Sequence, residues 1–290
     1  MKQVWLRKFV RGFVKQHPHI NKRLLCEVYH ISRSTLYYKP YKIIADTIAK
    51  TKIQVVHVFE PYYGHRRLSY YLKVQRKKVL RVVQVYALYG RTRKRKFCKP
   101  VDRNFAHMWV ANKKKELEIE SLHQVWSSDF THLCYKWKEI FLATVLDEYS
   151  KQIVGHTLWF HHGKELVIAA LKTAVSKTST TPNILHSDQW SEYRSYEYFE
   201  VLKRYNIGAS MSRKSSPWEN SSQESFYGKL KFEMWNLNRF SSVEEVIEAI
   251  HLWIFYYNTH RIHTTLKMSP KDFALLHPSN DTRLNHFRVQ

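Results

Sequence analysis

The sequence contains few cysteines, glycines and prolines and no long apolar segment. Its three cysteines, Cys26, Cys98 and Cys134, form no Cys-x-x-Cys pair, which argues against a disulfide framework or a zinc finger and fits a reducing cytosol. No run of about 18 apolar residues occurs without a charge, which excludes a membrane-spanning helix. Residues 1–15 are basic and lack the apolar core and cleavage site of a secretory signal. We therefore expect a cytoplasmic protein with no membrane partner and no zinc.

Acidic residues are also scarce, and the basic residues are concentrated in the first part of the chain. There are 48 Lys and Arg residues against 24 Asp and Glu, a formal net charge of +24. Residues 1–120 hold 29 basic and 7 acidic residues, whereas residues 121–290 hold 19 and 17. This asymmetry predicts that the front binds a polyanion, and nucleic acid is the leading candidate because each neutralised phosphate releases counterions. A simple solubility bias fits less well, because the basic region is also rich in apolar and aromatic residues.

Residues 1–45 have the pattern of a helix-turn-helix segment. Apolar residues within 4–15 form a helical stripe, and Asn21 is placed to cap a helix that runs to Tyr29. The following HISRSTLYY reads as a short turn and a basic, Ser-rich helix, whose Arg33 and Ser34 could reach base edges and phosphates. An ordinary helical hairpin would give the same pattern.

Residues 46–120 are predicted to be a basic, helical DNA-binding region with a linker. A helical pattern over 42–58 precedes the motif YYGHRRLSYYL, and residues 91–99 contain six basic residues in nine. Such a run is typical of a solvated or phosphate-contacting segment. The candidate DNA contacts in this region are its clustered cations: Arg66, Arg67, Arg93, Lys94, Arg95 and Lys96.

The pattern changes near residue 121 to that of an α/β domain. Strands are predicted at 125–133, 140–146, 153–160, 183–186 and 207–211, and helices at 163–177, 195–206 and 220–235. This order predicts a mixed sheet with flanking helices over 121–240. A helical pattern at 242–258 opens a segment, 241–290, that we expect to pack on this core.

Three acidic residues stand where chemistry could use them. Asp129 lies inside the strand-like WSSDFTHL, Asp188 ends the strand in ILHSDQW, and Glu224 lies on the helix predicted over 220–235. Buried carboxylates are costly unless something pairs with them. Mg²⁺ suits such ligands because it prefers oxygen and binds substrate phosphates, and two ions can activate a nucleophile and stabilise a leaving oxygen.

Other residues offer competing interpretations. Asp147 in VLDEYS is another strand-end acid, but its neighbours favour a turn, and Glu219, just after Pro217, suits a helix start. Glu233 is nine residues after Glu224 and is predicted to face the opposite side of the helix. His186 is a candidate neighbour of the acidic site. Three residues that follow the predicted helix 242–258 could contact DNA or lock that helix to the core, and the structural role is favoured slightly: Asn258, Arg261 and His263.

Taken in order, the segments YYGHRRLSYYL, WSSDFTHL, LHSDQWSEY, SMSRKSSPWENSSQESFYGKLKFE and YYNTHRIHTTL resemble the second-open-reading-frame transposases of the IS-three family of bacterial insertion sequences, and the catalytic core of retroviral integrases. The likeness covers nearly the whole chain. It implies a ribonuclease-H-like fold in which Asp129, Asp188 and Glu224 bind Mg²⁺, or Mn²⁺ as a substitute, and Lys231 contacts terminal DNA.

The resemblance also implies an activity and partners. The expected reaction is cleavage at the element's ends followed by strand transfer into a target duplex. The expected assembly is a homo-oligomer on paired terminal repeats in the bacterial cytoplasm, at the nucleoid, together with a form fused to the product of an upstream reading frame. Two alternatives share these residues: a metal-dependent nuclease of the same fold, and a decayed transposase that only binds DNA.

The chain departs from the family pattern beside the acidic residues. Trp190 stands where the family usually has glycine after Ser-Asp-Gln. Lys214-Ser215-Ser216-Pro217 and Glu219-Asn220-Ser221 replace the usual Lys-Gly-Asn-Pro and Asp-Asn-Ala. Losing glycine removes the freedom to adopt positive φ in these loops, which favours reduced activity. The three acids are intact, which favours a catalytic protein.

Overall fold

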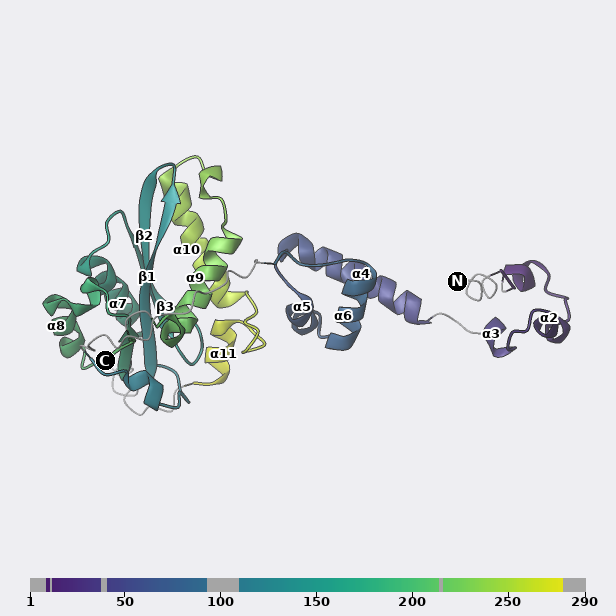
Figure 1. The fold of residues 1–290 in the computed structure, drawn as a ribbon, viewed down its shortest axis with the longest axis horizontal. Coiled ribbons are helices and arrows are strands. Elements are labelled where there is room, and N and C mark those ends of the chain that lie inside the picture. The colour runs from purple at the N-terminus through teal and green to yellow at the C-terminus, as the bar shows by residue number, and fades with distance from the viewer. Residues whose placement is uncertain (1–8, 11, 38–40, 93–109, 214–215, 279–290) are drawn as a thin grey trace. The chain divides into compact units, whose positions relative to one another are not determined.

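The computed structural model describes residues 9–10, 12–37, 41–92, 110–213 and 216–278. The chain divides into two units, one of Met1–Phe59 with Lys77–Tyr89 and one of Glu60–Arg76 with Gly90–Gln290 (Figure 1). This division differs from the expected segments 1–45 and 46–120, because Glu60–Arg76 belongs with the second unit. No helix among the described residues is both long enough and apolar enough to cross a membrane.

The first unit is helical. It contains α2 (Lys22–Val28), α3 (Ser34–Tyr37), α4 (Tyr41–Phe59) and most of α6 (Arg76–Val85). Asn21 caps α2 as predicted, since its side chain accepts hydrogen bonds from the backbone N–H groups of Arg23 and Leu24. Residues 9–10 and 12–16 are also helical, and the rest of the predicted stripe at 4–15 lies outside the described residues.

Helix α6 was not predicted. The residues up to Tyr89 were read only as a basic stretch, but Val79, Val82 and Val83 repeat at helical spacing and are buried. Arg81 on α6 donates a hydrogen bond to Asp46 on α4 within the same unit.

The second unit is built on a five-stranded mixed sheet in the order β3-β2-β1-β4-β5. The strands are β1 (Val125–Tyr135), β2 (Lys138–Asp147), β3 (Ile153–Trp159), β4 (Ile184–Ser187) and β5 (Gly208–Met211). The first three strands pair antiparallel, while β4 runs parallel to both β1 and β5. The predicted mixed sheet with flanking helices, preceded by a helical region, is therefore confirmed.

Helices cover both faces of the sheet (Figure 1). α7 (Lys164–Thr178) and α8 (Tyr196–Arg204) pack on one face around Trp126 and Phe141. α9 (Ser221–Glu233) and α10 (Val243–Thr259) pack on the other, around Leu133 and Ile140. The helix α10 thus forms part of the core, and α11 (Pro270–Leu276), which the sequence pattern did not predict, follows it.

The segment Glu60–Arg76, which contains α5 (His65–Leu72), is fastened to the C-terminal part of the second unit. The Tyr63 hydroxyl accepts a hydrogen bond from the Ile262 N–H at 2.9 Å, and the Tyr62 hydroxyl donates to the Glu233 carbonyl at 3.2 Å. The Tyr256 hydroxyl donates to the Glu60 carboxylate. The motif read from sequence as part of the basic front therefore belongs to the unit that holds the sheet.

Candidate active site

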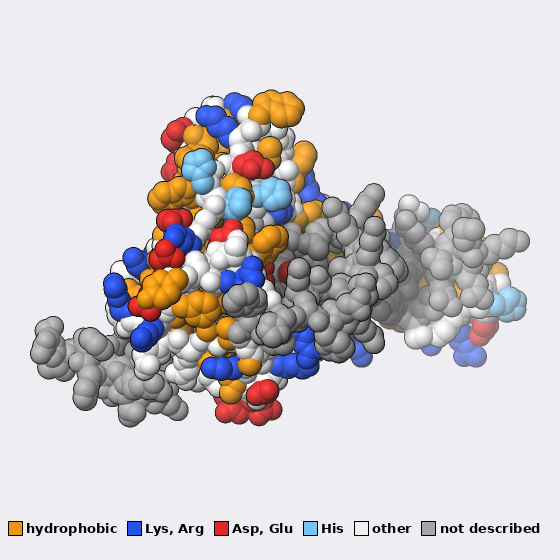
Figure 2. Space-filling model, turned by 60° about the vertical axis from the view of Figure 1, so that its left-hand side comes forward, with side chains coloured by type: hydrophobic (Ala, Val, Ile, Leu, Met, Phe, Trp, Pro, Cys, Tyr) orange, Lys and Arg blue, Asp and Glu red, His pale blue; other side chains and the backbone are white. Residues whose placement is uncertain are grey.

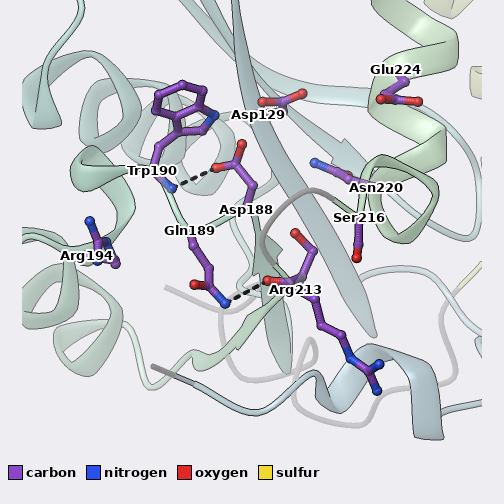
Figure 3. Close-up of a pocket in the computed structure, with 10 residues that line it drawn as sticks. Asp129, Asp188, Gln189, Trp190, Arg194, Arg213, Ser216, Asn220 and Glu224 are labelled. Atoms are coloured by element: carbon purple, nitrogen blue, oxygen red, sulfur yellow. Dashed lines mark hydrogen bonds between the residues drawn. The ribbon is translucent and has the colours of Figure 1, made fainter. Parts of the chain in front are cut away.

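Asp129, Asp188 and Glu224 line one pocket of about 460 Å³ in the second unit (Figure 3). The three acids come from separate elements, namely β1, the residue that follows β4, and the first turn of α9. The rest of the lining is polar or aromatic: Gln189, Trp190, Arg194, Ser212, Arg213, Ser216 and Asn220. The structure thus brings together the three acids that the sequence singled out.

The register of the parallel strands places the two aspartates beside each other. Ser127 of β1 pairs with His186 of β4. Asp129 and Asp188 each lie two residues further along, so both side chains point to the same face of the sheet. That face is the one covered by α9, which carries Glu224.

Helix α9 is held over β1 by hydrogen bonds to the strand backbone. The Gln223 amide donates to the Ser127 carbonyl at 2.7 Å and to the Thr144 carbonyl at 3.2 Å. The Tyr227 hydroxyl donates to the Asp129 carbonyl at 2.6 Å. Both side chains are buried, so the helix that carries Glu224 is fixed directly to the strand that carries Asp129.

The two aspartates lie in an environment that disfavours their charge. Burial, followed by the nearby charges of Asp188 and Glu224, raises the pKa of Asp129 to about 8. Burial also raises the pKa of Asp188 to about 6. The hydrogen bonds from the Phe130 N–H to Asp129 and from the Trp190 N–H to Asp188 offset only part of this. The site therefore favours the binding of positive charge.

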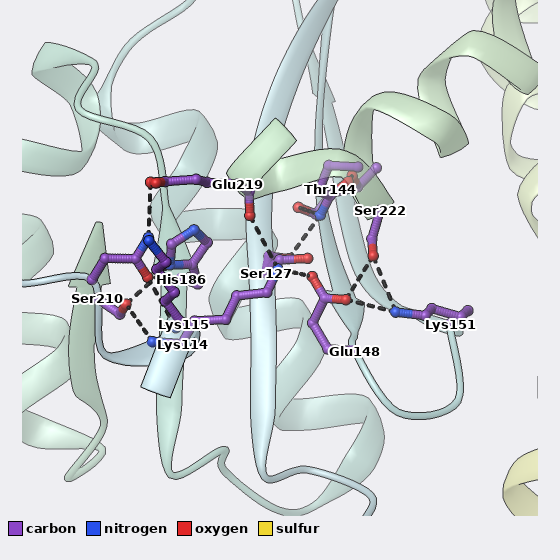
Figure 4. A network of polar contacts seen from close by, with 12 residues as sticks. Lys114, Lys115, Ser127, Thr144, Glu148, Lys151, His186, Ser210, Glu219 and Ser222 are labelled. Carbon is purple, nitrogen blue, oxygen red and sulfur yellow. Dashed lines mark hydrogen bonds and ion pairs between the residues drawn. The ribbon is translucent and has the colours of Figure 1, made fainter. Parts of the chain in front are cut away.

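A second polar network, missed in the sequence, braces the start of α9 (Figure 4). Glu148, which is 4% exposed, forms ion pairs with Lys114 and Lys151 and accepts a hydrogen bond from the Ser222 hydroxyl at 2.6 Å. Burial alone would raise the pKa of Glu148, but the two lysines hold it at about 2. Ser222 is two residues before Glu224, so this network positions the helix start. The acid was visible in VLDEYS, but its partner Lys114 is 34 residues away.

The competing acids have structural partners. Asp147 is fully buried and accepts hydrogen bonds from the backbone N–H groups of His123 and Ser150, as a turn acid does. Glu219 accepts from the Arg213 N–H at 2.8 Å at the start of a 3₁₀ turn. Neither lines the pocket that holds the three acids.

Residues near the end of α10 lock the helix to the core. The Asn258 side chain makes two 2.9 Å hydrogen bonds with the backbone of Ile153 on β3. Arg261 forms a buried ion pair with Glu233. Burial lowers the pKa of His263 to about 3. These contacts agree with the favoured structural role.

His186, the expected neighbour of the acidic site, is buried on β4. Its Nδ1 lies 3.0 Å from the Ser210 hydroxyl of β5, and burial lowers its pKa to about 4. The imidazole is thus neutral and links two strands.

The predicted DNA contacts lie in different places. Burial lowers the pKa of the Lys231 ammonium on α9, and the nearby Asp129 carboxylate offsets part of this effect. Arg33 and Ser34 are exposed in the first unit, and Arg66 is exposed on α5. Arg67 is half-buried and lines a second pocket beside Glu224. The remaining four candidates lie outside the described residues: Arg93, Lys94, Arg95 and Lys96.

Charges of both signs lie on the surface of the part of the second unit that follows residue 120 (Figure 2). On the face that Figure 2 shows, basic and acidic side chains lie among exposed hydrophobic ones. Residues 121–290 carry 19 basic and 17 acidic residues. Cations line both pockets that Glu224 lines: Arg194 and Arg213 in the first, and Arg67, Arg91, Lys229 and Arg261 in the second.

The loop that lacks the family's glycine is not strained. Trp190 has φ −61°, a value that any residue adopts, and its indole is 59% exposed at the edge of the pocket. Ser216 has φ −114°. Positive φ is therefore not needed at Trp190, whereas the second glycine position, Ser215, lies outside the described residues, as does Lys214.

Comparison with known proteins agrees with this architecture. Two family models described as "Integrase core domain" match residues 120–217 and 205–270. The transposase for insertion sequence element IS904 of Lactococcus lactis is 32% identical over 236 residues, which cover 78% of this chain and 93% of that protein. An uncharacterized transposase-like protein of Haemophilus influenzae is 30% identical over 203 residues, covering 70% and 94%. Transposase InsF of IS3A in Escherichia coli is 30% identical over 154 residues, covering 52% and 54%.

Among solved structures, a chain of the simian T-cell lymphotropic virus intasome, in complex with a PP2A regulatory subunit, matches with a TM-score of 0.50 at 15% identity. The match covers 80% of this chain and 78% of that one. This likeness concerns the fold, which is the ribonuclease-H-like fold of an integrase catalytic core.

The fold and the matched core define a polynucleotidyl transferase of the DDE type, the class of enzyme that cleaves and rejoins DNA phosphodiesters. Within that class, the chain belongs to the insertion-sequence transposases of the IS3 type, and its function is DNA transposition.

Proposed function

We propose that Asp129, Asp188 and Glu224 are the catalytic carboxylates with which this transposase cuts the ends of its insertion sequence and joins the freed 3′-hydroxyl to a target duplex. The observation that carries the proposal is their convergence in one pocket from three elements that are far apart in sequence. Both reactions are in-line displacements at a phosphodiester, so one site can serve both.

The donor set fits divalent metal ions with oxygen ligands. All three groups are carboxylates, burial is the main cause that raises the pKa of Asp129 and of Asp188, and no cysteine lines the pocket. No three His, Cys, Asp or Glu side chains in the described part of the chain are gathered closely enough to hold a single ion. Asp129, Asp188 and Glu224 are the residues that would hold such ions. Mg²⁺, or Mn²⁺ in its place, would activate the attacking oxygen and offset charge on the leaving oxygen.

The other residues of the site would hold the DNA in position. Arg194 and Arg213 line the pocket and can contact phosphates on either side of the reacting bond. Lys231, close to Asp129, can contact the terminal nucleotides. Tyr227 and Gln223 keep α9 in place and do not contact the substrate.

The basic front would bind the DNA more broadly. Residues 1–120 carry a net charge of +22, and Arg33, Ser34 and Arg66 are exposed there. We propose that this region grips terminal repeats and target, that the protein works as a homo-oligomer on paired ends in the bacterial cytoplasm, and that a fusion with an upstream-frame product supplies further end recognition. The intasome named above is an assembly of that viral protein, and it supports the proposed oligomer by analogy of fold.

The test is a cleavage and joining assay on duplexes that carry the terminal repeat of the encoding element. Asp129→Asn, Asp188→Asn and Glu224→Gln should each abolish both products, and excess chelator should abolish them for the unaltered chain. Glu200→Gln, an exposed acid on α8, is the matched control and should retain activity. Cleavage without joined products would indicate a nuclease, and metal-dependent cleavage by Asp129→Asn would refute the assignment.

A further inference from the structure

A second pocket, of about 520 Å³, lies on the other side of Glu224 from the first. Four cationic side chains and two carboxylates, Glu224 and Glu233, are part of its lining. The cations are Arg67, Arg91, Lys229 and Arg261. All of them belong to the second unit, and Glu224 lines both pockets.

Arg261, which lines this pocket, has a buried donor atom without a hydrogen-bond partner among the described residues. The residue is 2% exposed, and its Nε and Nη2 atoms bind the Glu233 carboxylate at 2.6–3.2 Å. Its Nη1 atom has no hydrogen-bond partner among the described residues. A buried guanidinium N–H without an acceptor is costly, so this atom indicates a place for an anion.

Arg67 is brought to the same place by the Tyr62-Tyr63 anchor. Its guanidinium lies 5.5 Å from the centre of the Tyr63 ring and donates a long hydrogen bond, 3.4 Å, to the Tyr62 carbonyl. The hydroxyls of both tyrosines are fastened to residues beside the pocket, Glu233 and Ile262. The anchor therefore presents a cation from α5 to helix α9, about 160 residues away in sequence.

Lys229 adds a third charge, and its ammonium also lies 5.9 Å from the centre of the Tyr257 ring. Burial, followed by repulsion from Arg261 and Arg67, lowers the pKa of its ammonium to about 7. Glu233 opposes this, but its carboxylate is already occupied by Arg261 and by the Trp253 indole N–H. Like charges gathered around one committed acid destabilise a fold, and proteins retain such clusters where a ligand uses them.

We propose that the pocket formed by Arg67, Lys229 and Arg261 binds one backbone phosphate of the DNA strand that is cut at the neighbouring carboxylates. A phosphodiester presents two acceptor oxygens, which match the free guanidinium N–H of Arg261 and the ammonium of Lys229. Because Glu224 lies between the two pockets, a phosphate bound here sets the register of the strand against the catalytic site. The proposal rests on the proposed function for the identity of that strand.

The test measures binding, so that it does not depend on catalysis. The full-length Asp129→Asn chain is titrated with a duplex carrying the element's terminal repeat, and with duplexes in which one phosphate at a time near the cleavage point is a neutral methylphosphonate. In this background Lys229→Gln should weaken binding about tenfold and reduce the slope of log K against log salt by about one phosphate. At one position on the cut strand, the methylphosphonate should weaken the parent about tenfold and leave Lys229→Gln unaffected.

A matched control and a stability measurement separate this role from a structural one. Lys172→Gln, an exposed lysine on α7 on the opposite face of the sheet, should bind with the parent's affinity. The Tm of Lys229→Gln should equal or exceed that of the parent, because a repulsive charge is removed. The proposal would be overturned if the effects of Lys229→Gln and of the methylphosphonate were additive at every position, or if they were non-additive only on a target strand. It would also be overturned if a lowered Tm accounted for the lost affinity. Cleavage by Asp129→Asn would refute the catalytic assignment, but the binding measurements would still test the phosphate pocket.

Discussion

Two carboxylates of the second unit, the buried Glu148 and the half-buried Asp129, have opposite electrostatic environments. Glu148 is paired with two lysines and a serine hydroxyl, and its pKa is about 2. Asp129 accepts a hydrogen bond from the N–H of Phe130 and has two acids as neighbours, and its pKa is about 8. The protein itself satisfies the first, whereas the second has the environment expected of an acid that binds a cation, as proposed above. Burial alone does not separate these two kinds of acid, but the partners that the protein provides do.

The largest effect expected from this contrast is on catalysis. Asp129→Asn should lower cleavage at least about 1,000-fold, because it removes a charge that holds metal. It should not lower the thermal stability of the metal-free protein, since asparagine keeps an acceptor for the Phe130 N–H and carries no unpaired charge. Cleavage rates and Tm values measured in chelator and in Mg²⁺ check this. A Tm several degrees below the parent in chelator would mean that Asp129 is a structural acid after all.

Glu148→Gln should have the reverse profile. It strips two buried or half-buried lysines of their partner, so we expect a loss of about 3 kcal/mol in the free energy of unfolding, measured by urea denaturation. Cleavage under conditions where the variant is folded should fall only modestly, because the substitution acts through the start of α9. Glu200→Gln, an exposed acid without these partners, provides the baseline. Unchanged stability would show that the ion pairs contribute nothing net.

The pH at which folding stability is lost differs between buried, neutral histidines and an ion-paired carboxylate. Burial is the main cause that lowers the pKa of both His156 and His263 to about 3, so both are neutral when folded. The unfolded chain binds protons at these histidines below about pH 6.5, so stability is complete above that pH and falls as the pH drops towards 3. The pKa of Glu148 is lowered in the folded chain, so the stability that its ion pairs contribute is lost only as the pH falls from its ordinary pKa of 4.5 to about 2.

Urea titrations at a series of pH values test this order. We expect a loss of about 1–2 kcal/mol per histidine by pH 5, while the difference between the unaltered chain and Glu148→Gln stays constant down to about pH 4.5. A chain equally stable at pH 7 and pH 5 would contradict the burial of both imidazoles.

Much of this arrangement could be predicted from sequence, and its failures have physical causes. The strands and the helices of the second unit follow from apolar periodicity, and the acids from their placement in or after strands. Helix α6 was missed because its basic residues hid the spacing of Val79, Val82 and Val83. The pairing of Glu148 with Lys114 and the docking of Tyr63 onto Ile262 were missed because they join residues 34 and 199 positions apart. Local pattern carries no information about such contacts.

The smallest effect is expected at Trp190, where the family's glycine is absent. Because Trp190 already has φ −61°, restoring glycine relieves no strain. The backbone N–H that donates to Asp188 is retained in Trp190→Gly, but the indole, whose hydrogen bond also lowers the pKa of Asp188, is lost. Glycine instead increases the freedom of the unfolded chain and removes the contact with Phe130, so we expect a loss of about 1 kcal/mol in stability. Urea denaturation of Trp190→Gly checks this. Trp137→Gly is not a suitable control, because Trp137 has φ 69° and glycine would relieve strain there. A gain in stability on restoring glycine would show that the loop beside the unpaired acid is strained, and that the decay of this element had begun there.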